Sequence, residues 1–274
     1  MSTARGYVVA VHADDLFADT TYQRPLDTRR ARSMAAAWDR RLAGIVEVSD
    51  RGEDETPRYA IIDGQHRWAA AQLLTDPPLL VANVHEGLNI GQEAALFDKL
   101  NRQRKQPTPW DHWRARKAAG DRQVLAIDAC VRRHGLEVAE GVRDGHIVCI
   151  STLEKIGAAP SGIDLLAATL NVAHHAWGDQ KAAYEAPILH GLAMVIAAFD
   201  EHLDATRLVT ALLETAPQRI RSKATMMRDS GTPGALAKLT AIAVLAEYNK
   251  QPGPKLNWPD GWKGVLPEAK ADNA

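Results

Sequence analysis

The sequence predicts an α+β protein in which a small α/β domain precedes a mainly helical one. Short runs rich in β-branched and other apolar residues occur in the first third of the chain, separated by segments with helical spacing. Beyond about residue 135 the sequence changes to Ala-rich and Leu-rich stretches with a helical period. We therefore expect an α/β domain at residues 1–110, a mainly helical domain at 111–250 and an irregular tail at 251–274.

Four strands are expected in the first domain, at residues 6–12, 44–49, 58–63 and 79–85. A polar segment at 50–56 lies between the second and third of them and predicts that these two form a hairpin. One continuous helix should begin after Asp27 as its N-cap and end at Gly44. Two further helices are expected at 65–74 and 91–104, the first of them directly after the third strand.

The second domain should be built mostly from helices. Pro107 and Pro109 end the preceding helix, and the apolar spacing then predicts helices near residue 110 and at 124–134, 151–156, 163–176, 187–203, 207–215 and 235–249. A short β element is expected at 142–150, with a turn at Asp144-Gly145. The tail is too rich in Pro and Gly for a regular element, and Trp258 and Trp262 should attach it to the helices.

Composition excludes several classes of protein. The 274 residues carry 33 Lys and Arg against 34 Asp and Glu, and a net charge of -1 argues against a wholly basic nucleic-acid coat. Cys130 and Cys149 are too few for a disulfide framework or a four-thiolate zinc site, so a cytoplasmic location is expected. No metal site is predicted, because the histidines lack ligand spacing. The sequence also predicts no membrane span and no secretory signal.

The junction between the third strand and its helix is the most informative segment. The strand ends at Asp63, Gly64 permits a tight turn, and a helix with polar and cationic residues follows. Free N–H groups at a helix N-terminus and the positive end of the helix dipole favour an anion there, and Arg67 can add a bidentate phosphate contact. The alternative is an ordinary strand-to-helix turn with a solvated arginine.

The residues of this junction, DGQHRWAAA at 63–71, resemble the central motif of the ParB/sulfiredoxin superfamily, most closely its DGQHR branch. Upstream, the segment YQRPL at 22–26 resembles the opening of DGQHR domains. Downstream, NRQR at 101–104 resembles the Asn-x-Gln-Arg element of ParB-type proteins, and the strand at 79–85 lies between them in its usual place. The resemblance covers about residues 6–111, well under half of the chain.

The resemblance implies a ParB/sulfiredoxin-like α/β domain that holds the phosphates of a nucleoside triphosphate, CTP or ATP. Seven residues are assigned to that pocket by their place in the motifs: Gly64, Gln65, His66, Arg67, Asn101, Arg104 and Arg24. Chains of this layout resemble small ParB-like proteins of actinobacterial phages, which would place this one in a bacterial host's cytoplasm. The resemblance leaves a homodimer open.

Two departures from the superfamily bear on catalysis. Sulfiredoxins carry a catalytic Cys where this chain has Gln65, so sulfinic acid repair is not expected. ParB has acidic residues at this position and at the one held here by Leu100, and their loss puts Mg²⁺ coordination and nucleotide hydrolysis in question. Asp63 is the nearest carboxylate that can act as a base or metal ligand, and its alternative role is a turn or capping carboxylate.

Positive charge is concentrated in two segments that flank this motif. Residues 99–122 carry a net charge of +6, and residues 24–41 carry +4. Together with Arg67 they predict a face for DNA, whose candidate contacts are Arg102, Lys105, Arg114 and Lys117. The alternative is a set of solvated helix faces. Trp110 and Trp113 lie in one of these segments, and their helical spacing favours packing over base stacking.

Three functional hypotheses follow. The first is a protein that binds a nucleoside triphosphate, with or without Mg²⁺, and acts on or beside DNA. The second is an enzyme of the same superfamily, an ATP-dependent kinase or a nuclease, that uses Asp63 with a metal ion. The third is a non-catalytic scaffold for protein partners. A helix-turn-helix is not predicted after the pocket, because the β element at 142–150 interrupts it.

Overall fold

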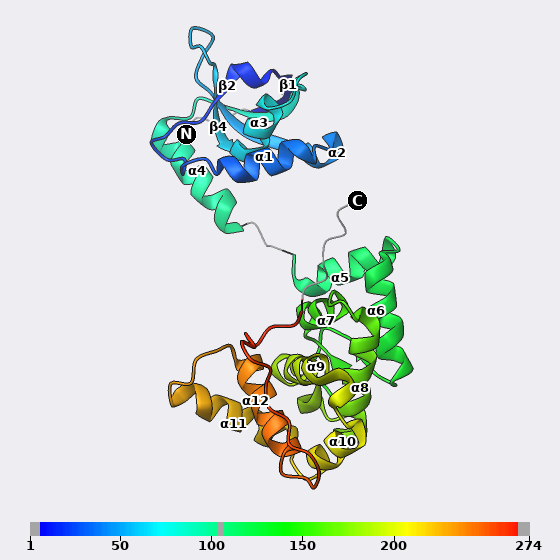
Figure 1. Ribbon diagram of the computed structural model, residues 1–274. Helices are drawn as coiled ribbons and strands as arrows, with labels where there is room; N and C mark the ends of the chain where they lie inside the picture. The colour runs from blue at the N-terminus through cyan, green and yellow to red at the C-terminus, as the bar shows by residue number, and fades with distance from the viewer. Residues whose placement is uncertain (1–5, 104–106, 268–274) are drawn as a thin grey trace. The chain divides into compact units, whose positions relative to one another are not determined.

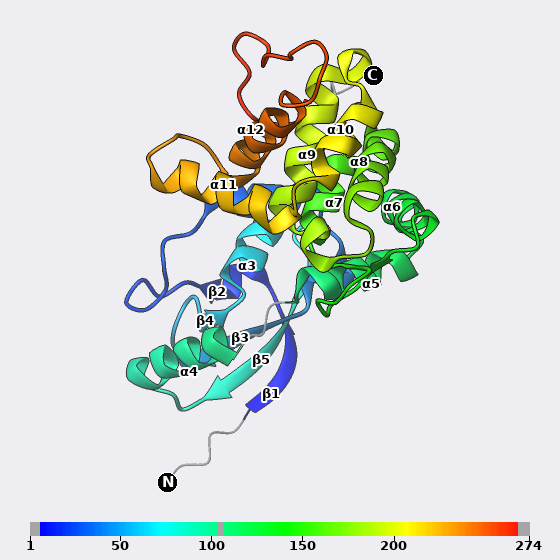
Figure 2. The same ribbon diagram turned by 90° about the horizontal axis from the view of Figure 1, so that it is seen from below.

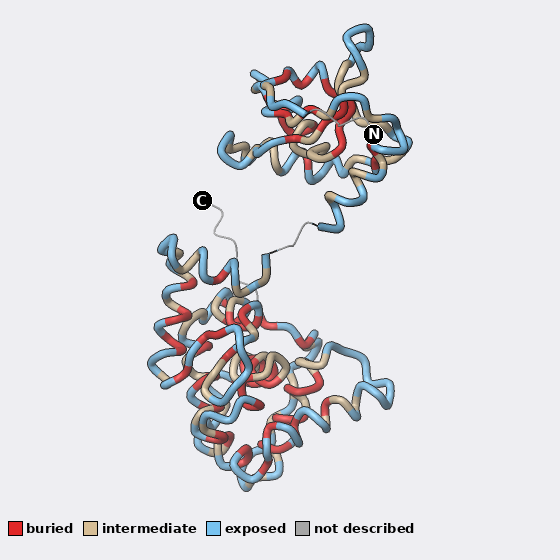
Figure 3. The backbone as a smooth tube through the Cα atoms, turned by 180° about the vertical axis from the view of Figure 1, so that it is seen from behind, coloured by how far each residue is buried: buried red, intermediate tan, exposed pale blue. Residues whose placement is uncertain are grey.

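The computed structural model describes residues 6–103 and 107–267. The chain forms two compact units, Met1–Gln106 and Pro107–Ala274 (Figure 1). Each unit has its own hydrophobic core, and Figure 3 shows the buried backbone in the interior of each. The protein is therefore α+β: the first unit combines a sheet with helices, and the second is mainly helical.

The first unit contains a five-stranded sheet in the order β1-β5-β3-β4-β2. Its strands are β1 (Gly6–Val11), β2 (Leu16–Phe17), β3 (Ile45–Asp50), β4 (Tyr59–Asp63) and β5 (Leu80–Glu86). Strands β3 and β4 pair antiparallel with Val48 opposite Ile61, which confirms the predicted hairpin. Strand β5 pairs parallel with β3 and antiparallel with β1, while β2 is parallel to β4.

The prediction of one helix from Asp27 to Gly44 was wrong, because two helices occupy this segment. Helix α1 (Thr28–Ala36) begins as expected, with the Asp27 carboxylate accepting a hydrogen bond from the Arg30 N–H at 3.0 Å. It ends at Ala36, and the short helix α2 (Arg40–Ala43) begins after Asp39. The Asp39 carboxylate accepts from the N–H of Arg41 at 2.9 Å, and this N-cap starts a new helix instead of continuing α1.

The other two α-helices of the first unit lie close to their predicted positions. Helix α3 (Gln65–Gln72) follows β4 directly, and α4 (Ile90–Gln103) follows β5 (Figure 2). The short 3-10 helix η1 (Ala13–Asp15) contacts α3, whose Trp68 Nε1 donates to the Ala13 carbonyl at 2.8 Å. Trp38 and Trp68 are partly buried and pack against the core of this unit.

The core of the first unit lies against one face of the sheet, where α1 and α3 pack together. It is formed by small and branched apolar side chains: Val11, Leu16, Val46, Val48, Ile61, Ala71, Leu80, Ala82 and Val84. Helix α4 contacts β4 and is joined to the end of the hairpin by an ion pair. Both Glu93 oxygens accept from Arg51, at 2.8 and 2.6 Å, and the Glu93 side chain is fully buried.

The second unit consists of helices around a single apolar core. Its α-helices are α5 (Pro109–Ala118), α6 (Arg122–Arg133), α7 (Ile150–Gly157), α8 (Gly162–Trp177), α9 (Ala186–Phe199), α10 (Ala205–Leu213), α11 (Pro217–Asp229) and α12 (Leu236–Tyr248). Helix α9 is almost entirely apolar and lies between α8 and α12 (Figure 1). The 3-10 helices η2 (Lys181–Tyr184) and η3 (Asp200–His202) flank α9.

Two sequence predictions for the second unit need correction, whereas helix α5 begins close to its predicted position. Pro109 begins helix α5, where its missing N–H costs nothing, and Thr108 and Asp111 form a capping box around it. Helix α11 was not predicted, because its polar sequence gives a weak apolar stripe. The β element is two residues long, β7 (His146–Ile147), and it pairs parallel with β6 (Glu137–Val138), so Asp144-Gly145 is not a hairpin turn.

The tail has no helix or strand over its described residues, as predicted. Trp258 and Trp262 stack on each other with their ring centroids 3.6 Å apart, and Trp258 contacts Phe199 at the end of α9. Both tryptophans pack against the core of the second unit, which confirms their predicted role. Over residues 6–103 and 107–267, no helix has the length and apolar character needed to cross a membrane.

Candidate functional site

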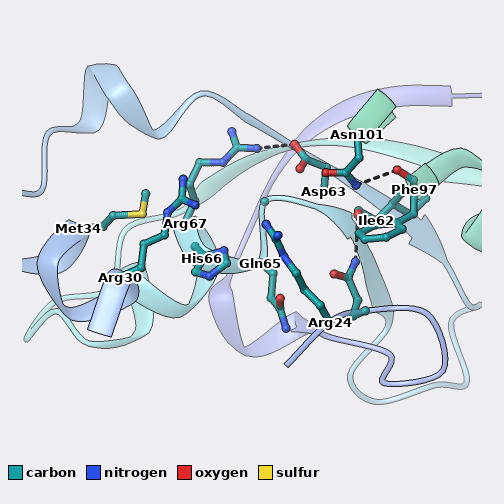
Figure 4. A pocket seen from close by; sticks show the side chains of 12 residues that line it. Arg24, Arg30, Met34, Ile62, Asp63, Gln65, His66, Arg67, Phe97 and Asn101 are labelled. Carbon is teal, nitrogen blue, oxygen red and sulfur yellow. Dashed lines mark hydrogen bonds and ion pairs between the residues drawn. The ribbon is translucent and has the colours of Figure 1, made fainter. Parts of the chain in front are cut away.

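A pocket of about 330 Å³ opens in the first unit at the N-terminus of α3 (Figure 4). Its walls come from the segment before α1, from α1 itself, from the β4–α3 turn and from α4. The lining residues are Gln23, Arg24, Arg30, Met34, Ile62, Asp63, Gly64, Gln65, His66, Arg67, Phe97 and Asn101. The pocket therefore contains six of the seven residues assigned to the phosphate site, together with Asp63.

The floor of the pocket is the first turn of α3. The N–H groups of Arg67 and Trp68 donate to the Gly64 carbonyl at 2.9 and 3.0 Å. The N–H groups of Gln65 and His66 have no acceptor among the residues that the structure describes. Two free N–H donors and the positive end of the helix dipole thus face the same place, as an anion requires.

Gly64 is required by the geometry of this turn. Its φ of 107° lies in the left-handed region, and a Cβ atom built on it would approach Val46 Cγ1 to 2.6 Å. The glycine lets β4 turn into α3 while α3 stays close to the sheet. The close approach, which the sequence motif alone does not reveal, fixes where the first turn of α3 points.

Arg67 is held by the protein itself. Its Nη1 donates to the carbonyls of Ala43 and Ile45, both at 2.9 Å, and its Nη2 donates to Asp63 Oδ2 at 2.9 Å. The side chains of Arg67 and Asp63 are 17% and 19% exposed, so this ion pair is well shielded from water. Arg67 therefore connects the end of α2, the start of β3 and the end of β4 while lining the pocket.

Two other arginines of the pocket are differently placed. Arg24 and Arg30 are exposed, and neither forms an ion pair within the described parts of the chain. His66 lies between them in the pocket lining, and its Nε2 atom is buried without a hydrogen-bond partner among those residues. Burial and the charges of Arg30 and Arg24 lower the pKa of His66 below its usual value, against a smaller opposite effect of Asp27.

The wall opposite α1 is formed by α4 and the segment before α1. The Asn101 amide points back along α4, and its Nδ2 donates to the Phe97 carbonyl at 2.8 Å. The carboxamide oxygen of Asn101 has no hydrogen-bond partner among the described residues. Gln23 is buried and donates from Nε2 to the carbonyls of Ile61 and Ile62, at 2.8 and 3.0 Å. Gln23 thereby fixes the Tyr-Gln-Arg segment beside β4 and places Arg24 at the pocket.

Five lining residues were not predicted from the sequence: Gln23, Arg30, Met34, Ile62 and Phe97. Gln23 lies inside the quoted YQR segment, and that motif could have indicated it. Arg30 was visible only as one cation of a basic segment. Nothing in the sequence places Met34 or Phe97 at the pocket, because their contribution depends on how α1 and α4 pack. Arg104 lies outside the described residues.

The candidate DNA contacts do not form one described surface. Arg102 is exposed on α4 and pairs with Asp98, while Lys105 lies outside the described residues. Arg114 and Lys117 belong to α5 in the second unit, and Lys117 pairs with Asp128 at 2.7 Å. In the same unit, Trp113 is buried and Trp110 packs against the core, as their spacing predicted.

Acidic residues do not gather at this pocket. Over the described residues, no cluster of three or more His, Cys, Asp or Glu side chains could hold a metal ion. Asp63 is the pocket's one carboxylate within that part of the chain, and it is bonded to Arg67. The arrangement is suited to binding a negative group and offers few groups for proton transfer or metal coordination.

The fold and this pocket define an α+β protein with a cationic cavity at a strand–turn–helix junction. The chain matches a family of unknown function, DUF6551, over residues 17–251, and it belongs to that family. No curated protein matches it. Among solved structures it is similar to the C-terminally truncated chromosome-partitioning protein ParB from Caulobacter crescentus, solved in complex with CTP-gamma-S. That likeness has 14% identity and a TM-score of 0.35, covering 85% of this chain and 98% of the other.

Proposed function

We propose that the pocket binds the phosphate chain of a nucleoside triphosphate. The observation that carries this proposal is the convergence of two exposed arginines, Arg24 and Arg30, on the free N–H groups of the α3 N-terminus. Neither arginine is neutralised by a carboxylate within the described residues, so their charges remain available to a ligand. Charge-assisted hydrogen bonds of this kind are the strongest that an arginine offers to phosphate.

Each residue of the pocket has a distinct part in this proposal. The N–H groups of Gln65 and His66 hold one phosphate, and Arg24 and Arg30 neutralise the rest of the chain. Arg67 positions the turn and adds positive charge without being free to move. The Asn101 amide, on α4, supplies a polar contact at the far end. CTP and ATP are the expected ligands, because the DGQHR and NRQR motifs resemble those of ParB-type proteins.

We further propose that the bound nucleotide alters how the protein acts on or beside DNA. The support is the exposed positive charge of α1, where Arg29, Arg30 and Arg32 are all exposed. An enzymatic role is less well supported, because Asp63 is bonded to Arg67 and is poorly placed to act as a base. If ATP turnover or DNA cleavage is measured and is lost in Asp63→Asn, the enzymatic hypothesis replaces this one.

The proposal is tested by thermal denaturation of the full chain with each of the four nucleoside triphosphates, with and without Mg²⁺ and duplex DNA. A ligand that binds only the folded state raises the Tm. We expect CTP or ATP to do so, and we expect Arg24→Ala and Arg30→Ala to weaken binding by about tenfold or more, since each removes a charged hydrogen bond worth roughly 1.5–3 kcal/mol.

Arg29→Ala is the matched control for Arg30→Ala. Both residues are exposed on α1 and both changes remove one positive charge, but Arg29 does not line the pocket. Arg29→Ala should leave the dissociation constant for nucleotide within about twofold of wild type, because it changes only the long-range charge. Equal losses in the two variants, or no Tm shift with any nucleotide at millimolar concentration, would contradict the proposal.

A further inference from the structure

An apolar hollow of about 270 Å³ adjoins the phosphate pocket. It lies at the junction of α1 and α2, and its lining residues are Ser33, Met34, Ala37, Trp38, Asp39, Leu42, Ala43 and Arg67. The hollow exists because α1 ends at Ala36 and α2 begins at Arg40, so the chain bends where one continuous helix was predicted.

The hollow and the phosphate pocket share two lining residues, Met34 and Arg67. In Figure 4, Met34 and Arg30 lie at one end of the phosphate pocket, and Asn101 and Phe97 lie at the other. The two cavities therefore adjoin at the Met34 side chain and the fixed Arg67 guanidinium. A ligand with an anionic part and an apolar part can occupy both cavities at once.

The chemistry of the hollow differs from that of the pocket. Leu42 is 77% exposed although it is a large apolar side chain, and Trp38 is only partly covered by the core. The small side chains of Ala37 and Ala43 also line the hollow. An aromatic side chain beside exposed aliphatic ones offers a stacking surface for a planar ring. Asp39 also lines the hollow, and both oxygens of its carboxylate accept hydrogen bonds from Arg41.

We propose that this hollow holds the nucleobase of the nucleotide whose phosphates lie at the α3 N-terminus. The inference rests on the proposed function and specifies its ligand: a nucleotide, as opposed to inorganic phosphate or polyphosphate. The shared residues provide the argument for this occupant, because Met34 and Arg67 line both the phosphate pocket and the hollow. The Trp38 ring stacks on the base, and Leu42 covers its outer edge.

The test compares CTP and ATP with inorganic tripolyphosphate, which carries the same chain of phosphates without a base. Dissociation constants are measured by calorimetric titration of the full chain. Base–aromatic stacking is worth roughly 1–3 kcal/mol, so wild type should bind its preferred nucleotide about tenfold more tightly than tripolyphosphate. Ala37→Phe, which fills the hollow, and Leu42→Ala, which opens its wall, should reduce this preference while leaving tripolyphosphate binding unchanged.

Leu73→Ala is the control, because Leu73 is also an exposed leucine at a helix end and lines neither cavity. It should keep the full preference for nucleotide. The inference is overturned if wild type binds nucleotide and tripolyphosphate equally, or if both hollow variants retain the preference. If neither nucleotide nor tripolyphosphate binds wild type, the proposed phosphate site is wrong. Equal binding of the two ligands is a distinct result, which overturns only the proposed base site.

Discussion

Gly64 shows how a single residue sets the geometry of the site. The sequence indicates a glycine in a strand-to-helix turn, which many proteins contain. The structure adds that its φ is 107° and that Val46 packs directly against it, leaving no space for a Cβ atom. Backbone conformation and packing therefore both require glycine at this position. Only the turn conformation could be predicted from the sequence.

Gly64→Ala should destabilise the first unit by about 2–4 kcal/mol, from backbone strain and overpacking against Val46. Gly52 is the matched control, because it has the same φ of 107° and a Cβ atom added there would meet no atom within 4 Å. Gly52→Ala should cost only about 1 kcal/mol. Urea unfolding of both variants checks the difference, and equal costs would show that the contact with Val46 is unimportant.

His66 should make stability depend on pH. Its pKa is lowered in the folded protein by burial and by Arg30 and Arg24, so the unfolded chain takes up a proton more readily than the native one. Stability should be lost as the pH falls through about 6.5, and above that value His66 should have no effect. His66→Gln should reduce the loss measured by urea unfolding between about pH 7 and about pH 5. An unchanged profile in that variant would contradict the assignment.

At the scale of elements, helix and strand types were largely predictable and their interruptions were not. The polar segment at 50–56 between two apolar runs indicated the hairpin of β3 and β4, and Asp27 marked the start of α1. The end of α1 was missed because the apolar spacing continues through Trp38 and Leu42. Asp39 also fits the pattern of an N-cap. Whether such a residue starts a new helix or lies within a continuing one depends on tertiary packing.

Arg67 joins elements that are distant in sequence, so its removal should affect all of them. Arg67→Ala would leave the carbonyls of Ala43 and Ile45 and the Asp63 carboxylate without this donor, at a cost of about 2–4 kcal/mol. Arg67→Lys should restore little, because one ammonium cannot replace the guanidinium geometry. Hydrogen exchange of the β3 and β4 amides, together with urea unfolding, measures the effect.

The control for this prediction is Arg102→Ala. Arg102 also forms an ion pair with an aspartate four residues away, but its side chain is 79% exposed. Its loss should cost less than about 0.5 kcal/mol. If the two alanine variants are equally stable, the contacts of Arg67 do not hold these elements together.

At the scale of the whole molecule, the two units have separate cores with no buried residue in common. We therefore propose that residues 1–106 and 107–274 fold independently. Each fragment, expressed alone, should show a cooperative thermal transition by circular dichroism, and the first should keep the Tm shift with nucleotide. A fragment 107–274 that is unfolded alone would contradict this prediction.

The sequence by itself determined the α+β class, the positions of most strands and helices, and the location of a glycine turn with cationic residues at a helix start. These features depend on local periodicity, turn residues and capping, which neighbouring positions encode. Only the tertiary structure decided that Arg67 is bound to Asp63 and two carbonyls while Arg24 and Arg30 remain free of carboxylates within the described residues. It also decided that a break in one expected helix opens an apolar hollow. Such features depend on contacts between residues far apart in the chain, for which a single sequence carries no local signal.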